Sequence, residues 1–296
     1  MAVEVPACSV CGRRPAVYYR SYSGHRLCRK DLVDTARRLV SRSLSRVNPS
    51  PRSVIAIPVV SFSPGSSILL AELVAGIERR FPSRVVTLVP SALRDAVAGA
   101  ISRAEGALGE VMYVDVNVGP PAELDAVDCI RYERAWSLRA AREVGADILA
   151  MPLSRTDLAM LLLESALMRG EGLSEAIPAI TVEGISVVAG FGEAERELVA
   201  ALEFLEGLGD VRPACAIRFR SKRVFMSIYG RPEVDYGGLA VAEALYSAAA
   251  RSMARCAVCG GLSREGEVCG TCLRLGLKGL SVALRPAGPT SPPGPS

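Results

Sequence analysis

The chain has 296 residues, 50% of them hydrophobic, and its 35 basic against 31 acidic residues give a net charge of +4. This length and apolar content suffice for one large domain with small appendages. The longest apolar runs, 54–60 and 158–168, are too short or too interrupted to span a bilayer, so we expect no membrane insertion. The first residues lack the basic and apolar regions of a secretion signal. The nine cysteines therefore indicate thiol or metal chemistry in the reducing cytoplasm.

Residues 1–31 have the pattern of a small metal ribbon. Cys8 and Cys11 form a Cys-x-x-Cys pair, and Cys28 follows further along the chain. Because two thiolates at this spacing can occupy adjacent corners of a tetrahedron, the pattern predicts a zinc site.

Residues 32–46 predict a helix with one apolar face. Arg38, Arg42 and Arg46 follow one another at four-residue spacing on another face. The planar guanidinium suits phosphate recognition, so this stripe is a candidate RNA-binding surface, with an ordinary solvated face as the alternative.

Strand and helix patterns then alternate as far as residue 253. Apolar strands are expected at 54–62, 85–89, 111–118, 147–151 and 185–189, with helices at 68–80, 92–107, 129–144, 156–169 and 193–208. This alternation predicts an α/β domain with a parallel sheet covered on both faces. The Ser- and Gly-rich turn 61–67 ends the first strand, at the sheet edge where ligands bind. Its hydroxyls and amides are suited to cap a helix or to hold an anion.

A second ribbon is predicted over residues 254–280. It contains two Cys-x-x-Cys pairs, which supply a full tetrahedral set: Cys256, Cys259, Cys269 and Cys272. The alanine-rich helix expected at 239–253 before it is suited to pack internally or to form a dimer. The tail 281–296 is rich in Pro, Gly and Ser and is expected to be disordered.

A ribbon at each end of a domain with a Ser-rich first loop resembles the TtuA-type tRNA 2-thiouridine synthetases and their eukaryotic cytoplasmic tRNA 2-thiolation relatives. The stretches Cys8–Gly12, Tyr22–Cys28, Cys256–Gly260 and Cys269–Cys272 carry the resemblance. It implies a PP-loop, Rossmann-like fold of the adenine nucleotide alpha hydrolase type. It also implies ATP as cofactor, tRNA as partner and sulfur from a ubiquitin-like carrier.

The nucleotide loop of this family, Ser-Gly-Gly-Lys-Asp-Ser, is altered here. Ser61 and Ser66 keep the outer positions, and Phe62, Ser63, Pro64 and Gly65 replace the residues between them. The lost glycines let amides approach pyrophosphate, and the lost lysine neutralises it. ATP hydrolysis at normal rates is therefore not expected, although Ser61, Ser63, Gly65 and Ser66 remain the candidate nucleotide-binding residues. Of the family's second motif, only Asp157 is present, and we interpret it as a helix cap.

Two isolated cysteines fall near the family's cluster-binding or sulfur-handling positions. Cys129 has Ala126 and Tyr132 three residues to either side, so its Cys-x-x-Cys pair is broken, and Cys215 matches the last position loosely. Two thiols are fewer than the three protein ligands usual in the family, which argues against an iron–sulfur cluster. Cys129 and Cys215 remain candidates for catalytic sulfur transfer, and burial as small apolar residues is the alternative.

The first ribbon also departs from the family. The fourth ligand, three residues after the third cysteine, is Asp31 here, whereas His25, the only histidine, lies three residues before it. Family position favours Asp31, and ligand chemistry favours His25.

The altered loop is similar to that of a degenerate paralogue in eukaryotic thiolation complexes, as are Ser154–Ala159 and Leu167–Gly170. The resemblance therefore favours an accessory subunit that binds tRNA, a catalytic paralogue or both. Two alternatives remain: an active tRNA sulfurtransferase with an altered loop, and a zinc-ribbon RNA-binding protein outside thiolation.

Overall fold

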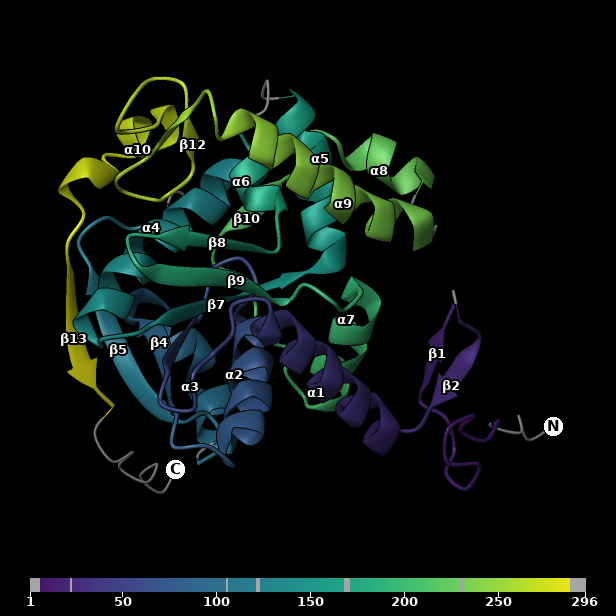
Figure 1. Ribbon diagram of the computed structural model, residues 1–296. Coiled ribbons are helices and arrows are strands. Elements are labelled where there is room, and N and C mark those ends of the chain that lie inside the picture. The colour runs from purple at the N-terminus through teal and green to yellow at the C-terminus, as the bar shows by residue number, and fades with distance from the viewer. Residues whose placement is uncertain are drawn as a thin grey trace.

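The computed structural model describes residues 6–21, 23–104, 106–120, 123–167, 171–228 and 232–287. A seven-stranded sheet with the order β13-β5-β4-β3-β7-β9-β8 forms its centre (Figure 1). The five inner strands are parallel: β5 (Glu110–Val116), β4 (Arg84–Pro90), β3 (Val54–Pro58), β7 (Ile148–Ser154) and β9 (Ile185–Phe191). The predicted α/β class is confirmed. Strand order reverses between β3 and β7, so the gap beyond their carboxyl ends is the topological switch point.

Side chains of the parallel strands alternate between two cores because successive residues of a strand point to opposite faces. On β3, Ile55 and Ile57 face one core and Ala56 faces the other. The first core is covered by α1 (Arg29–Ser45), α2 (Pro64–Glu78), α3 (Arg94–Arg103) with its preceding 3-10 turn η1 (Ser91–Leu93), and α7 (Arg196–Leu205). The second is covered by α4 (Ala126–Glu143), α5 (Arg155–Leu167), α6 (Leu173–Ala176) and α9 (Pro232–Ala249).

Both edges of the sheet are closed by antiparallel strands that the sequence patterns did not indicate. β8 (Ala179–Val182) forms a hairpin with β9, and β13 (Val282–Pro286) pairs with β5. The expected disorder from residue 281 is therefore wrong for β13, where Val282 and Leu284 pack against the core and the backbone completes the ladder of β5. The rest of that tail, 288–296, lies outside the described residues, as do residues 168–170.

Shorter elements near the switch point were also missed. β6 (Glu123–Asp125) and β10 (Ala216–Arg218) form a separate two-stranded parallel pair, and α8 (Lys222–Ile228) follows. The helix expected at 239–253 begins at Pro232 and packs internally against α5. Its role in a dimer stays a prediction. Within the described part of the chain, none of the helices is long and apolar enough to cross a bilayer.

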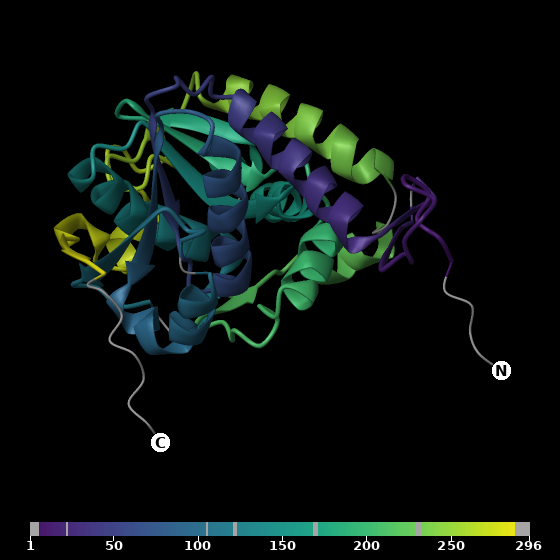
Figure 2. The same ribbon diagram turned by 90° about the horizontal axis from the view of Figure 1, so that it is seen from below.

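The two cysteine ribbons lie at opposite ends of the molecule, as Figures 1 and 2 both show. The N-terminal ribbon contains β1 (Tyr18–Arg20) and β2 (His25–Leu27), and the C-terminal ribbon contains β11 (Ala254–Arg255), β12 (Leu262–Ser263), α10 (Gly270–Arg274) and the 3-10 turn η2 (Leu277–Gly279). Arg20 fixes the first ribbon to α7 through two bonds to Glu195, at 2.6 and 2.8 Å. Both ends of this pair are largely buried, so the ribbon is held in one orientation.

Candidate functional site

The four cysteines of the C-terminal ribbon are close enough to share one metal ion. Their Sγ atoms all lie within 4.8 Å of one another, and those of Cys259 and Cys269 are 3.8 Å apart. Zinc–sulfur bonds of about 2.3 Å in a tetrahedron place the sulfur atoms about 3.8 Å apart. All four side chains are buried. The group therefore fits a closed structural zinc site.

The N-terminal ribbon gathers three thiols and one carboxylate. Cys8, Cys11, Cys28 and Asp31 offer ligand atoms that all lie within 4.8 Å of one another. Asp31 Oδ2 accepts from the Sγ atoms of Cys8 and Cys28, each at 3.1 Å. These bonds hold the pKa of the Asp31 carboxyl below its ordinary value.

His25 lies outside this group. It is an exposed residue of β2, where it lines a shallow hollow against α1, and it is not among the four clustered ligand residues. Asp31 is in the cluster because Cys28 precedes α1 and Asp31 occupies its first turn. Of the two candidates for the fourth ligand, Asp31 is the one that lies beside the three thiols, contrary to the preference for His25 from ligand chemistry; metal binding by Asp31 stays a prediction.

Two buried arginines connect the C-terminal ribbon to α4. Arg134 Nε donates to the carbonyl of Cys259 at 2.6 Å, and Arg131 Nη2 donates to that of Leu262 at 2.9 Å. Both guanidinium groups also pair with buried Glu175. Two guanidinium groups face this one carboxylate, so one positive charge remains uncompensated among them. A tetrathiolate zinc centre carries two negative charges and would offset it.

At the switch point, the altered loop is occupied by carboxylates of the protein itself. The Ser61 amide donates to Glu133 Oε1 at 2.9 Å, and the Ser61 hydroxyl bonds the same oxygen. Trp136 Nε1 donates to the other oxygen at 2.6 Å. Burial raises the pKa of Glu133. An amide that is free to receive an anion in a phosphate loop is thus already bonded.

On the far side of the loop, the serine hydroxyls are likewise bonded to groups of the protein itself. Ser63 Oγ and Ser66 Oγ are 2.7 Å apart, and Ser66 also bonds the carboxylate of Glu203. Arg196 brings one positive charge, 3.0 Å from Ser66 Oγ, but its guanidinium also lies 4.0 Å from Glu203. Pro64 begins α2 and has no amide hydrogen. A β-carbon at Gly65 would meet the carbonyl oxygen of Leu208 at 2.9 Å, so the aspartate of the family loop does not fit here.

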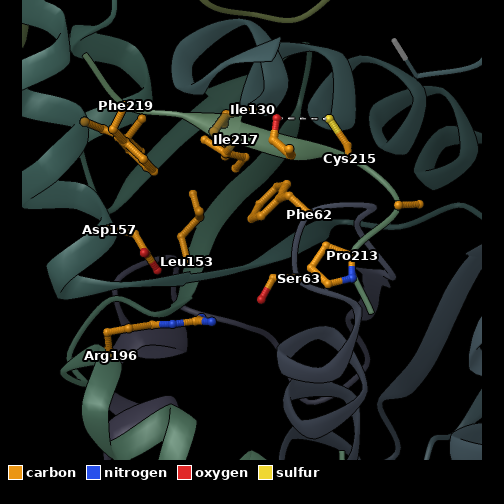
Figure 3. Close-up of a pocket in the computed structure, with 13 residues that line it drawn as sticks. Phe62, Ser63, Ile130, Leu153, Asp157, Arg196, Pro213, Cys215, Ile217 and Phe219 are labelled. Atoms are coloured by element: carbon orange, nitrogen blue, oxygen red, sulfur yellow. Dashed lines mark hydrogen bonds between the residues drawn. The ribbon is translucent and has the colours of Figure 1, made fainter. Parts of the chain in front are cut away.

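A cavity of about 650 Å³ opens in front of this loop (Figure 3). Most of its wall is apolar, with Phe62, Leu153 and Phe219 around it, and Arg196 and Asp157 lie on one side. Asp157 Oδ2 accepts the amide of Ser154 at 2.8 Å, and Ser154 Oγ accepts the amide of Asp157 at 3.2 Å. This reciprocal pair caps α5, which confirms the interpretation of Asp157 as a cap.

Cys129 and Cys215 meet behind the cavity although they are distant in sequence. Their Sγ atoms are 3.9 Å apart, both side chains are buried, and Cys215 lines the cavity. The hydrogen bond between the thiols, together with burial, raises the pKa of Cys129, whereas the bond from Cys129 lowers that of Cys215. Within the described residues, the pair belongs to no group of three ligand atoms. Two thiols alone are fewer than an iron–sulfur cluster ordinarily takes.

The three residues of the predicted arginine stripe differ in whether a carboxylate neutralises them. Arg46 pairs with Glu193 at 2.7 Å and with Glu243 of α9 at 3.1 Å, so its charge is compensated. Arg38 donates to Thr35 and to the backbone of its own helix, and Arg42 is exposed. Of the three stripe residues, Arg38 and Arg42 have no ion pair among the described residues, so their charges remain available toward solvent.

Comparison with known proteins gives a structural likeness. No protein-family model and no curated protein matches the chain. Among solved structures, the U34-tRNA thiolase NcsA from Methanococcus maripaludis, determined with its [4Fe-4S] cluster, is similar with a TM-score of 0.66. The match covers 83% of this chain and 89% of that chain at 17% identity. The chain has the fold of this tRNA thiolase.

Several functional residues could not be found from the sequence. Glu133, Glu203 and Arg196 lie on predicted helices, but neither spacing nor composition indicated that their side chains converge on one loop. Arg131 and Arg134 of the predicted helix 129–144 were missed as well, because a charge on a helix is normally expected to face water, and Glu175 lies where no helix was predicted.

The fourth ligand of the N-terminal site can be tested by metal analysis. We expect two zinc ions per chain, and after exposure to a chelator Asp31→Ala should retain about one, because three thiolates leave the site open. His25→Ala is the matched control and should retain both. Mass-spectrometric zinc quantification checks this. Loss of zinc from His25→Ala, with Asp31→Ala intact, would show that the histidine is the ligand.

Proposed function

We propose that the protein acts in tRNA 2-thiolation as an accessory subunit that binds tRNA, a catalytic paralogue or both, without using ATP as active thiolases do. The observation that carries the proposal is a thiolase fold whose phosphate loop is filled by its own carboxylates. The solved neighbour acts on tRNA, and the two zinc-type ribbons agree with the terminal ribbons of that family.

Electrostatics explain why the loop is unsuited to a nucleotide. A triphosphate at Ser61–Ser66 would have to displace Glu133 from the Ser61 amide and lie beside Glu203. Like charges a few ångströms apart repel strongly in a partly buried site. Arg196 is the one cation at the loop that the described contacts show, and its salt bridge to Glu203 weakens its pull on phosphate.

The two ribbons are the proposed zinc sites. Cys256, Cys259, Cys269 and Cys272 would hold one ion, and Cys8, Cys11, Cys28 and Asp31 the other. Closed sites of this kind stabilise small ribbons and keep no position open for substrate, so their role is structural.

Calorimetric titration with MgATP tests the proposal. We expect the wild-type chain to bind more weakly than about 1 mM. Glu133→Gln/Glu203→Gln should gain about tenfold or more in affinity, because two repulsive charges are removed. Glu143→Gln, which changes an exposed glutamate of α4, is the control and should gain nothing. Micromolar binding with AMP release by the wild-type chain would refute the proposal in favour of an active sulfurtransferase.

The paired cysteines support a second candidate function, the handling of sulfur by Cys129 and Cys215. A persulfide on Cys215 could be attacked by the sulfur of Cys129, whose proton passes to the departing outer sulfur. The S–S bond to the outer sulfur is then broken, a Cys129–Cys215 disulfide is formed and hydrogen sulfide is released. The 3.9 Å separation of the two Sγ atoms favours this step, and the lowered pKa of Cys215 favours its thiolate as the first nucleophile.

Peptide mass spectrometry after treatment with inorganic polysulfide checks this second function. The wild-type chain should yield a peptide pair linked through Cys129 and Cys215. Cys129→Ser should instead accumulate a persulfide on Cys215, because the resolving thiol is absent. If both cysteines of the wild-type chain remain free thiols under these conditions, the pair is a packing feature alone.

A further inference from the structure

A groove between α1 and the end of α2 collects five arginines. It has a volume of about 680 Å³, and its charged lining consists of Arg37, Arg38, Arg42, Arg79, Arg80 and a single acid, Asp34. Five guanidinium groups against one carboxylate leave four positive charges, as many as the net charge of the whole chain. The basic character of the protein is therefore concentrated at this surface.

These five charges are poorly compensated by carboxylates of the protein. Among the described residues, Arg42 and Arg80 form no ion pair, and Arg37 reaches Asp34 only at 3.7 Å on the exposed helix surface. Arg38 and Arg79 donate to a hydroxyl or to carbonyl groups, which leaves their charges in place. Elsewhere, Arg29, Arg84, Arg274 and Arg285 each pair with a carboxylate at 2.5 to 2.7 Å. A like-charged cluster of this kind favours a polyanionic partner.

An aromatic side chain lies in the same groove. Phe81 is 50% exposed and directly follows Arg80. A half-exposed phenylalanine among arginines offers a flat apolar face for stacking, which unpaired bases use and an acidic peptide does not.

The basic surface continues across α1 to the N-terminal ribbon. Arg38 and Arg42 also line a second hollow, of about 320 Å³, together with His25 and with Val10, which is 57% exposed. The surface thus runs from Phe81 over α1 to the metal ribbon. It also lies away from the altered loop, because α2 begins at that loop and its length of about 22 Å separates the two.

We propose that the groove between α1 and α2 binds a single-stranded segment of RNA, with arginines on the phosphates and an unpaired base stacked on Phe81. The inference rests on the proposed function in tRNA thiolation and adds where and how the RNA is held. Arg42 and Arg80 contact phosphates, and Phe81 supplies stacking without base specificity. The strand then passes toward His25 and Val10 of the ribbon.

Fluorescence anisotropy with a labelled single-stranded oligouridine of about 12 nucleotides, titrated at several salt concentrations, tests this site. Arg42→Gln/Arg80→Gln should bind roughly tenfold more weakly, and the slope of log affinity against log salt should fall by about 1.4. Arg139→Gln/Arg251→Gln removes the same charge from exposed positions outside the groove and should change affinity by less than about twofold.

Phe81 provides the second arm of the test. Phe81→Leu should weaken binding about fivefold or more with an unchanged salt slope, and Phe81→Tyr should bind as the wild type does. If the wild-type chain binds but the groove and control variants behave alike, RNA lies elsewhere; the site is then refuted while the proposed function stands. If it binds neither oligouridine nor a tRNA transcript, the inference is overturned, and the tRNA-binding form of the proposed function fails with it. Equal displacement by polyglutamate would assign the groove to an acidic protein and overturn the inference.

Discussion

The buried segment 129–134 of α4, whose polar side chains point to two different faces of the helix, is the constraint on which the rest of the structure depends. Arg131 and Arg134 reach the C-terminal ribbon, Glu133 reaches the loop after β3, and Cys129 meets Cys215. All four residues are almost completely buried within two turns of one helix. A change in the position of α4 would therefore act on the metal ribbon, the loop and the thiol pair together.

Buried charges are costly unless they are compensated, so these contacts depend on one another. Glu175 neutralises one of the two arginines, and a tetrathiolate zinc centre would neutralise the other. The C-terminal ribbon is then more than an appendage, since a metal bound there would contribute to the electrostatic balance of the α/β domain. On the loop side, Glu133 satisfies the Ser61 amide without an external anion. The loop is stable when no nucleotide is bound.

Sequence patterns were sufficient for the elements with strong periodicity and for the cysteine clusters with fixed spacing. The five parallel strands and both Cys-x-x-Cys ribbons follow from local signals, because burial on two faces and tetrahedral geometry each leave a regular pattern. The edge strand β13 was missed because its five residues were counted with the Pro- and Gly-rich tail that follows them; among the described strands it pairs with β5. The sequence patterns also could not predict which side chains converge in the folded chain. Glu133 and Ser61, or Arg42 and Arg80, come together only through the packing of helices on the sheet.

A thiolase fold that has closed its own nucleotide loop, and that concentrates uncompensated arginines on another surface, is suited to hold RNA while chemistry takes place elsewhere. The most direct test of this account is the 2-thiouridine content of tRNA, measured by nucleoside mass spectrometry after deletion of the gene. The account predicts a fall in 2-thiouridine that the wild-type gene restores. An unchanged 2-thiouridine content would contradict it and place the protein outside tRNA thiolation.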